Sequence, residues 1–477
     1  MEFLMDRRKF LAKSSAIAMA AVVAGPFEGA AHAAVQGKPA AGNGYGPLTA
    51  VPDLSDGQIR LHLPKGFAYR SFDPVGSNFT EGGTIPGYHD GMGAFRGPRG
   101  TVVLVRNHEI TWPLGAFGDP EKAYDPMAPG GTSTVTVTGR GEVLHTAPSL
   151  TGTLMNCSGG RMPWGSWISC EETINGPDVA NDYSGLPNAR FAQKHGYLFE
   201  VPVTSAVKPR PIRAAGRFTH ESAAYDPHTG AVYLTEDNYN FASGFYRYIP
   251  PRNPQTTGRL LDGGRLQMLA VRGEEGKDLS LGQPQHARYR VAWVDIDDPD
   301  PTYTGLPAND AAVNAVGDQG RGKGAALFAR LEGCVYHEGV VYFVSTQGGA
   351  TSEGEKAPSG FGDGRGQVWA YDTVTSELRL VFESPGSMTL DLPDNVTTSP
   401  RGTLVVCEDG GGDNYIRGLT RSGCLFDFAR LEPVSGDPGA EFAGSTFSPD
   451  GGTLFVNVQS AQGRSFAIWG PWQRGGF

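Results

Sequence analysis

The stretch that decides the fold is Phe218-Thr219-His220-Glu221-Ser222-Ala223-Ala224-Tyr225-Asp226-Pro227, continuing through Gly230 to Leu234-Thr235-Glu236-Asp237-Asn238. It predicts a β-hairpin, because two apolar segments flank a turn signal and the second segment ends in carboxylates. A hairpin returns the chain to its starting point, so Glu221 and the Glu236/Asp237 pair are expected at the same end of the sheet. Carboxylates gathered on rigid strands indicate a site for hard cations, which prefer oxygen ligands.

The same hairpin pattern recurs five more times along the chain. The openings at residues 91, 156, 221, 332, 394 and 444 lie 65, 65, 111, 62 and 50 residues apart. Each opening is followed by a turn glycine, in order Gly100, Gly165, Gly230, Gly339, Gly402 and Gly452. Most of these spacings fit one four-stranded propeller blade, which takes about 40–50 residues plus loops.

The predicted fold class is therefore all-β, a single six-bladed β-propeller with inserted loops over residues 34–477. A pair of β-sandwiches with incidental repeats is the main alternative. The long interval holds a segment rich in Gly, Arg and Asp at about 251–325. We interpret it as a strand pair plus an inserted loop, and the alternative is a seventh, degenerate blade.

Composition agrees with an exported, turn-rich protein. The 477 residues include 68 glycines and 35 prolines, only 19% are charged, and the net charge is −10. This negative balance argues against nucleic acid or an anionic membrane surface as the main partner.

The N-terminus carries a targeting signal. Asp6-Arg7-Arg8-Lys9-Phe10-Leu11 precedes a short apolar run, and Ala31-His32-Ala33 is a small-x-small cleavage site. Residues 1–33 are predicted to be a twin-arginine signal peptide, with an ordinary secretory signal or a single-pass anchor as alternatives. The apolar run is short for a permanent anchor. We expect the twin-arginine export machinery as a partner, no stable membrane anchor, and a monomeric periplasmic or secreted protein.

Ten acidic residues should gather at one mouth of the propeller, where unpaired carboxylates would repel one another. They are Glu109, Glu171, Glu172, Glu221, Glu236, Asp237, Glu332, Asp394, Glu408 and Asp409. Cations could neutralise them, or nearby basic residues could pair with them, and by sequence only Arg106 and Arg330 lie close. Several bound metal ions are the favoured interpretation, although individual acids could be strand caps or turn residues.

The cysteines refine the choice of metal. Cys170 stands in Ser169-Cys170-Glu171-Glu172, at the carboxylate end of a strand, where a thiolate suits iron or zinc while oxygen-only positions suit Ca²⁺. The other four, Cys157, Cys334, Cys407 and Cys424, are predicted to be small buried hydrophobic residues. A mixed cluster would supply a Lewis acid and a metal-bound oxide or hydroxide nucleophile. Arg330 would then stabilise the charge of a transferred phosphoryl group.

Several blocks resemble the PhoX-type alkaline phosphatases. They are Arg106-Asn107-His108-Glu109, Asn156-Cys157-Ser158-Gly159-Gly160, Pro163-Trp164-Gly165-Ser166-Trp167, Ser169-Cys170-Glu171-Glu172, His220-Glu221-Ser222-Ala223, Thr235-Glu236-Asp237-Asn238 and Arg330-Leu331-Glu332-Gly333, together with the twin-arginine signal. The resemblance covers nearly the whole mature chain. It implies an exported six-bladed propeller that hydrolyses small-molecule phosphate esters with a cluster of iron (Fe³⁺) and calcium (Ca²⁺) ions and a bridging oxo group.

The resemblance also implies roles for individual residues. Cys170 would be the thiolate ligand of iron, with Glu171 nearby as a ligand, and Arg330 with Asn107 or Asn156 would hold the phosphate. The remaining carboxylate ligands implied are Glu221, Glu332, Asp394, Glu109, Glu172, Asp237 and Glu408. The chain departs from the family in being shorter and in having Leu331 where a proline is expected. A calcium-dependent lactonase or other ester hydrolase, and a non-catalytic propeller stabilised by calcium, are the alternative functions.

Overall fold

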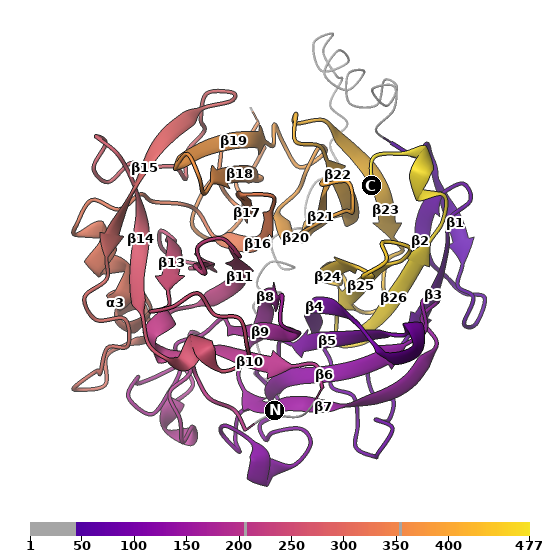
Figure 1. Ribbon diagram of the computed structural model, residues 1–477, viewed down its shortest axis with the longest axis horizontal. Helices are drawn as coiled ribbons and strands as arrows, with labels where there is room; N and C mark the ends of the chain where they lie inside the picture. Colours follow the sequence, from indigo (N-terminus) through magenta and orange to yellow (C-terminus); the bar gives the residue numbers. More distant parts are fainter. Residues whose placement is uncertain (1–43, 205–207, 353–354) are drawn as a thin grey trace.

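The computed structural model describes residues 44–204, 208–352 and 355–477 (Figure 1). The predicted signal peptide, residues 1–33, lies outside these ranges. Within them the protein is built of antiparallel β-sheets, with one α-helix, α3 (Asn309–Arg321). No helix of the described residues has both the length and the apolar character needed to cross a membrane.

The six predicted hairpins are all present as antiparallel pairs. They are β4 (His89–Arg96) with β5 (Val102–His108), β8 (Asn156–Met162) with β9 (Ser166–Glu171), β11 (His220–Tyr225) with β12 (Val232–Glu236), β16 (Leu331–His337) with β17 (Val340–Ser345), β20 (Pro393–Thr398) with β21 (Leu404–Glu408), and β24 (Glu441–Phe447) with β25 (Leu454–Gln459). Five of the six predicted turn glycines have a positive φ of 78–86°, a conformation that favours glycine. In the sixth turn Gly451, with φ 72°, takes the place predicted for Gly452.

Further strands extend each hairpin outward. The first sheet adds β6 (Gly130–Val137) and β7 (Val143–Thr153), and the second adds β10 (Leu198–Pro202). The hairpin β16–β17 continues through β18 (Gln367–Asp372) and β19 (Glu377–Glu383). The hairpin β20–β21 continues through β22 (Tyr415–Leu419), β23 (Leu425–Leu431), β2 (Ile59–Pro64) and β1 (Leu48–Pro52). The last sheet consists of β24, β25, β26 (Arg464–Trp469) and β3 (Ala68–Phe72). Because β3 pairs with β26, strands from the two ends of the chain share one sheet.

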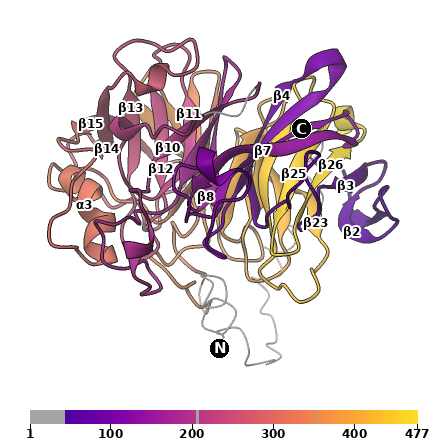
Figure 2. The same cartoon turned by 90° about the horizontal axis from the view of Figure 1, so that it is seen from below.

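The long interval contains the predicted strand pair and also a helix. The hairpin β11–β12 continues through β13 (Phe245–Ile249), β14 (Arg265–Val271) and β15 (Arg288–Asp295). Because β15 pairs with both β14 and β19, it joins two neighbouring sheets at their outer edges instead of starting a seventh one. The expected loop contains α3, which Figures 1 and 2 place at the periphery.

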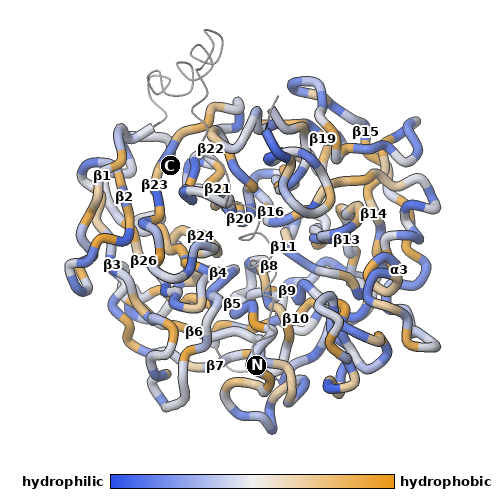
Figure 3. The backbone as a smooth tube through the Cα atoms, turned by 180° about the vertical axis from the view of Figure 1, so that it is seen from behind, coloured by the Kyte–Doolittle hydropathy of each residue, from blue (hydrophilic) through white to orange (hydrophobic). Residues whose placement is uncertain are grey.

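The innermost strands β4, β8, β11, β16, β20 and β24 surround the centre of the molecule, and each contacts the next (Figure 1). Six apolar clusters fill the spaces between successive sheets, and the cluster of Phe72, Met92 and Phe455 connects the last sheet to the first. Hydrophobic stretches fall mainly on strands and hydrophilic ones on connecting loops (Figure 3). Burial between neighbouring sheets therefore holds the ring together. Short 3₁₀ helices occur in the connections at Pro98–Gly100, Pro120–Lys122, Asn188–Arg190, Arg213–Ala215, Arg259–Leu261 and Trp472–Arg474.

Candidate metal centre

Each innermost strand carries a β-bulge near the point where it begins. In the hairpin β11–β12, His220 pairs with Glu236 and Ala223 with Leu234, so Glu221 and Ser222 together face one residue, Thr235. The same two-against-one register occurs in all six inner hairpins. A bulge interrupts the alternation of side chains and turns one of them in a new direction.

The first residue of each bulge supplies most of the centre. In chain order these residues are Asp90, Cys157, Glu221, Glu332, Asp394 and Gly444. Five of them carry metal-ligating side chains. The sixth is glycine because the backbone of β4 lies close: a Cβ on Gly444 would come within 2.3 Å of the carbonyl oxygen of Asp90.

The five side chains come together with two carboxylates from the ends of second strands, Glu109 after β5 and Glu172 after β9. Possible ligand atoms lie within 4.8 Å of one another in three groups: Asp90, Glu109 and Cys157; Cys157, Glu172 and Glu221; and Glu221, Glu332 and Asp394. Cys157 and Glu221 each belong to two groups. The seven residues thus form one chain of potential ligands, which we call the central ligand cluster.

Burial and mutual repulsion dominate the electrostatics of this cluster. Glu221 is fully buried, and neither of its carboxylate oxygens has a hydrogen-bond partner among the described residues. Burial, followed by the charges of Asp394 and Asp90, raises the pKa of Glu221 well above its usual range. Burial and the charge of Asp237 likewise raise the pKa of Glu332, and burial with the charge of Asp409 raises the pKa of Asp394 to about 7. Buried carboxylates without donors are the arrangement that bound cations stabilise, so the donor set fits metal ions.

Cys157 is buried, as predicted, and its thiol also belongs to two of the groups of potential ligands. Its Sγ lies 3.3 Å from Oδ2 of Asp90, to which the thiol donates. Burial and then the charges of Asp90 and Glu221 raise the pKa of this thiol well above its usual range. A bound cation would reverse that effect, because a coordinating thiol is deprotonated by its metal.

Cys170 lies elsewhere, contrary to the predicted iron ligand. It is fully buried in the apolar cluster between β8–β10 and β11–β14, with Ile168, Leu198 and Phe218 among its members. In the described ranges it belongs to none of the groups of potential ligands. The bulge places the potential thiol ligand, Cys157, on the first strand of this hairpin instead of the second.

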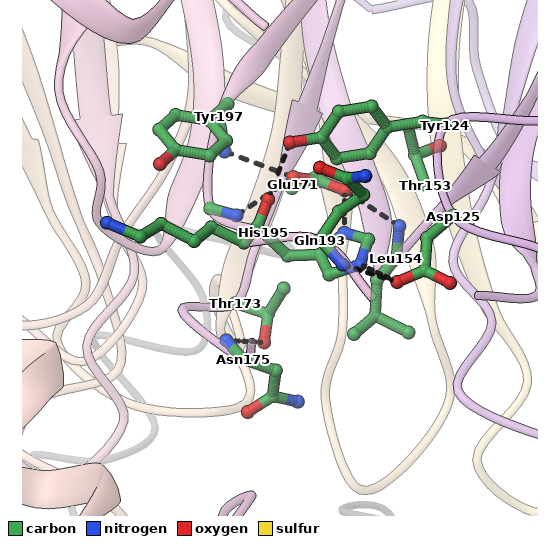
Figure 4. A network of polar contacts seen from close by, with 12 residues as sticks. Tyr124, Asp125, Thr153, Leu154, Glu171, Thr173, Asn175, Gln193, His195 and Tyr197 are labelled. Carbon is green, nitrogen blue, oxygen red and sulfur yellow. Dashed lines mark hydrogen bonds and ion pairs between the residues drawn. The ribbon is translucent and has the colours of Figure 1, made fainter. Parts of the chain in front are cut away.

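Glu171 is also placed differently from its prediction as a ligand, because protein donors occupy both of its oxygens (Figure 4). Oε1 accepts from the backbone N–H of Leu154 at 2.9 Å and lies 2.6 Å from Nδ1 of His195. Oε2 accepts from the backbone N–H groups of Gly196 and Tyr197 at 2.8 and 3.1 Å. Burial lowers the pKa of His195, but the charges of Glu171 and Asp125 outweigh it and raise this pKa to about 9. Glu171 therefore anchors, through Leu154, the segment that precedes β8.

Glu408 has the equivalent place in the β20–β21 hairpin and the same role. Its carboxylate accepts from the backbone N–H groups of Asp391 and Tyr415, both at 3.1 Å, and pairs with Arg417 at 2.9 Å. Asp391 leads into β20 just as Leu154 leads into β8. The predicted ligand role of Glu408 is thus replaced by an anchoring one.

Both carboxylate oxygens of Asp237 bind Arg330. Among the described residues, Asp237 belongs to none of the groups of potential ligands. Nε of Arg330 donates to Oδ1 at 3.0 Å and Nη2 to Oδ2 at 2.7 Å. Nη2 also donates to Oε1 of Glu332 at 3.1 Å. Asp237 therefore orients Arg330, and Arg330 reaches the central ligand cluster as predicted.

Asn107 and Asn156 both bond to protein groups through their side-chain amides. Nδ2 of Asn107 donates to the carbonyl oxygens of Cys157 at 2.9 Å and Ser158 at 2.7 Å. Its Oδ1 accepts from Trp167 and Ser169, both at 3.0 Å. Asn107 thereby holds the bulge that presents Cys157.

Asn156 is likewise fully buried and used on both sides. It donates to Oγ of Ser169 at 2.8 Å and accepts from Oγ1 of Thr153 at 2.7 Å. The side-chain amide of each asparagine is thus engaged by protein groups.

The structure brings together five of the predicted ligands, Glu109, Glu172, Glu221, Glu332 and Asp394, and it adds Asp90 and Cys157. Both additions stand at the position that Glu221 has in its own hairpin. An alignment of the six hairpins on that position would have found them.

The family model described as alkaline phosphatase PhoX matches residues 43–462. Among solved structures, Pseudomonas fluorescens PhoX in complex with vanadate, a transition-state analogue, is similar with a TM-score of 0.64 and 18% identity, and the match covers 91% of this chain and 98% of that one. At this identity the likeness concerns the fold.

A gluconolactonase from Xanthomonas campestris matches at a TM-score of 0.38 and 13% identity, over 89% of this chain and 98% of that one. A likeness this low carries no argument. No curated protein sequence matches the chain.

Proposed function

Because the chain belongs to the alkaline phosphatase PhoX family and is a phosphoric monoester hydrolase, we propose that the central ligand cluster binds Ca²⁺ and Fe³⁺ and is the site of hydrolysis. The observation that carries the proposal is the cluster itself: six buried or half-buried carboxylates and one thiol from successive hairpins. The thiol of Cys157 favours iron at its end of the cluster, and the oxygen-only group of Glu221, Glu332 and Asp394 favours calcium.

The protein's own groups would position the phosphate ester. When bound, the metal ions would supply Lewis acidity toward the phosphoryl oxygens. Arg330, held by the Asp237 carboxylate beside Glu332, would bind a phosphoryl oxygen through its guanidinium and stabilise the charge that develops there. Because Asp237 fixes the guanidinium through two hydrogen bonds, little reorganisation of Arg330 is needed during the reaction.

We further infer a six-bladed β-propeller, because six inner hairpins with the same bulge surround one centre and six apolar clusters connect their sheets. Export by the twin-arginine machinery through residues 1–33, to the periplasm or the exterior, is proposed from the sequence signal. That pathway carries folded proteins, which suits a protein whose metals are bound before export. A monomer remains the proposed state.

Elemental analysis of the purified protein, combined with a phosphatase assay at alkaline pH, tests the proposal. We expect iron together with calcium, hydrolysis of phosphate monoesters, loss of activity on chelation, and recovery only when both metals are returned. A fully active protein that contains calcium but no iron would refute the mixed cluster. Hydrolysis of lactones without phosphatase activity would favour the lactonase alternative.

A further inference from the structure

A cavity of about 340 Å³ adjoins the central ligand cluster. Glu172, a member of the cluster, lines it together with Asp237, which holds Arg330. This volume lies at the lower end of the range for small-molecule sites. A phosphate ester bound at the cluster would thus have space for its alcohol portion on this side.

One side of the cavity is apolar and includes aromatic rings. Ile174 and Val313 line it, and with Val179 and Ala312 they form a small buried cluster on which the half-buried Phe241 packs. Phe241, Tyr183 and Tyr239 supply the aromatic lining. The apolar side thus combines the loop after β9, the loop after β12, and α3.

The lining also offers hydrogen-bond donors. Asn238 lines the cavity and is 3% exposed, and its Nδ2 has no hydrogen-bond partner among the described residues. A buried donor without an acceptor is costly, so a ligand acceptor at this point would be favourable. Helix α3 begins at the cavity with Asn309 and Asp310, and no side chain caps its N-terminus. Its first N–H groups add further donors.

The charges of the lining limit what can enter. Glu172, Asp237 and Asp310 are all acidic, and Asp237 pairs with Arg330. A second anionic group on the alcohol portion would be repelled here. A neutral, planar group that stacks on aromatic rings and accepts a hydrogen bond fits this lining.

We propose that this cavity is a leaving-group subsite for phosphate monoesters whose alcohol carries a neutral aromatic or heteroaromatic ring with a hydrogen-bond acceptor. Phe241 contacts the face of the ring, and Nδ2 of Asn238 donates to its acceptor. This inference rests on the proposed function, because the phosphate has to lie at the central ligand cluster. It assigns a specificity role to the inserted segment that contains α3.

Two substrates that differ only by the ring test the proposal: adenosine 5′-monophosphate and ribose 5-phosphate, which share the same leaving oxygen. We expect the metal-loaded protein to have a kcat/KM about ten-fold higher for the nucleotide, as stacking and one hydrogen bond would give. Phe241→Ala and Asn238→Ala should each lower this ratio about five-fold. Phe241→Leu removes the ring but keeps the apolar packing, so a lower ratio in this variant reports the loss of the ring and not a folding defect.

Val374→Ala is the matched apolar truncation at an exposed turn between β18 and β19, and it should leave the ratio unchanged. A ratio near one in the native protein, or equal ratios in native and Phe241 variants, would overturn the subsite. If neither ester is hydrolysed, the proposed function fails, but the subsite is still tested by calorimetric binding of adenosine without phosphate. Binding that Phe241→Leu weakens supports the subsite, and absence of binding refutes it.

Discussion

The carboxyl group of Asp394 should make the metal-free protein less stable as the pH rises. Burial, and then the charge of Asp409, raises its pKa to about 7, whereas the same group in an unfolded chain has a pKa of about 3.9. Between these values the folded state binds a proton that the unfolded chain has released. The free energy of unfolding therefore falls as the pH rises from about 4 to about 7 and stays low above that range.

The size of the effect follows from the two pKa values. About three pKa units correspond to about 4 kcal/mol of lost stability at pH 8, because each unit is worth about 1.4 kcal/mol. At pH 5 the loss is only about 1.5 kcal/mol, because this pH is only about one unit above the pKa of the unfolded chain and the loss accumulates with each further unit up to about pH 7. Asp394→Asn removes this titration and can retain the contact with the side-chain amide of Asn395. In chelated protein it should therefore stabilise the fold, and more at pH 8 than at pH 5.

Urea unfolding of chelated native protein and of chelated Asp394→Asn, at pH 5 and pH 8, measures this difference. With calcium and iron present the sign should reverse, because the variant loses a ligand that a cation stabilises. The reasoning is refuted if Asp394→Asn destabilises the chelated protein at pH 8, or if its effect is the same at both pH values.

Three further predictions concern the chemistry of the cluster. Cys157→Ser should lose iron and phosphatase activity, whereas Cys170→Ser, a control at another buried cysteine, should keep both. Elemental analysis measures the iron content of each variant, and the phosphatase assay measures its activity. Glu221→Gln should lower kcat at least about 100-fold with loss of metal, but it should not lower the melting temperature of chelated protein. Arg330→Lys should lower kcat/KM about 100-fold, because lysine cannot replace the two-pronged contact with Asp237, and unchanged kinetics would remove Arg330 from the site.

The repeat of six hairpins could be predicted from the sequence alone. Turn glycines such as Gly230 and the apolar segments on either side of them predict hairpins through local chemistry, which does not depend on distant parts of the chain. The acidic ends of those hairpins also predicted a cation site at one end of the sheets, and Glu221, Glu332 and Asp394 do meet there. Helix α3 was missed because its sequence is rich in Gly and Asn, and packing of Ala312 and Val313 against the neighbouring loops supports it.

What only the tertiary structure decided is which of two neighbouring residues belongs to the centre. Successive side chains of a strand point to opposite faces, so Glu172 joins the cluster while Glu171 anchors a loop, although the two are chemically identical. A bulge shifts this alternation by one residue, and a pattern of residue types does not reveal where the shift falls. For that reason Cys157 lies among the potential ligands and Cys170 packs in a core, a distinction that depends on the register between two strands.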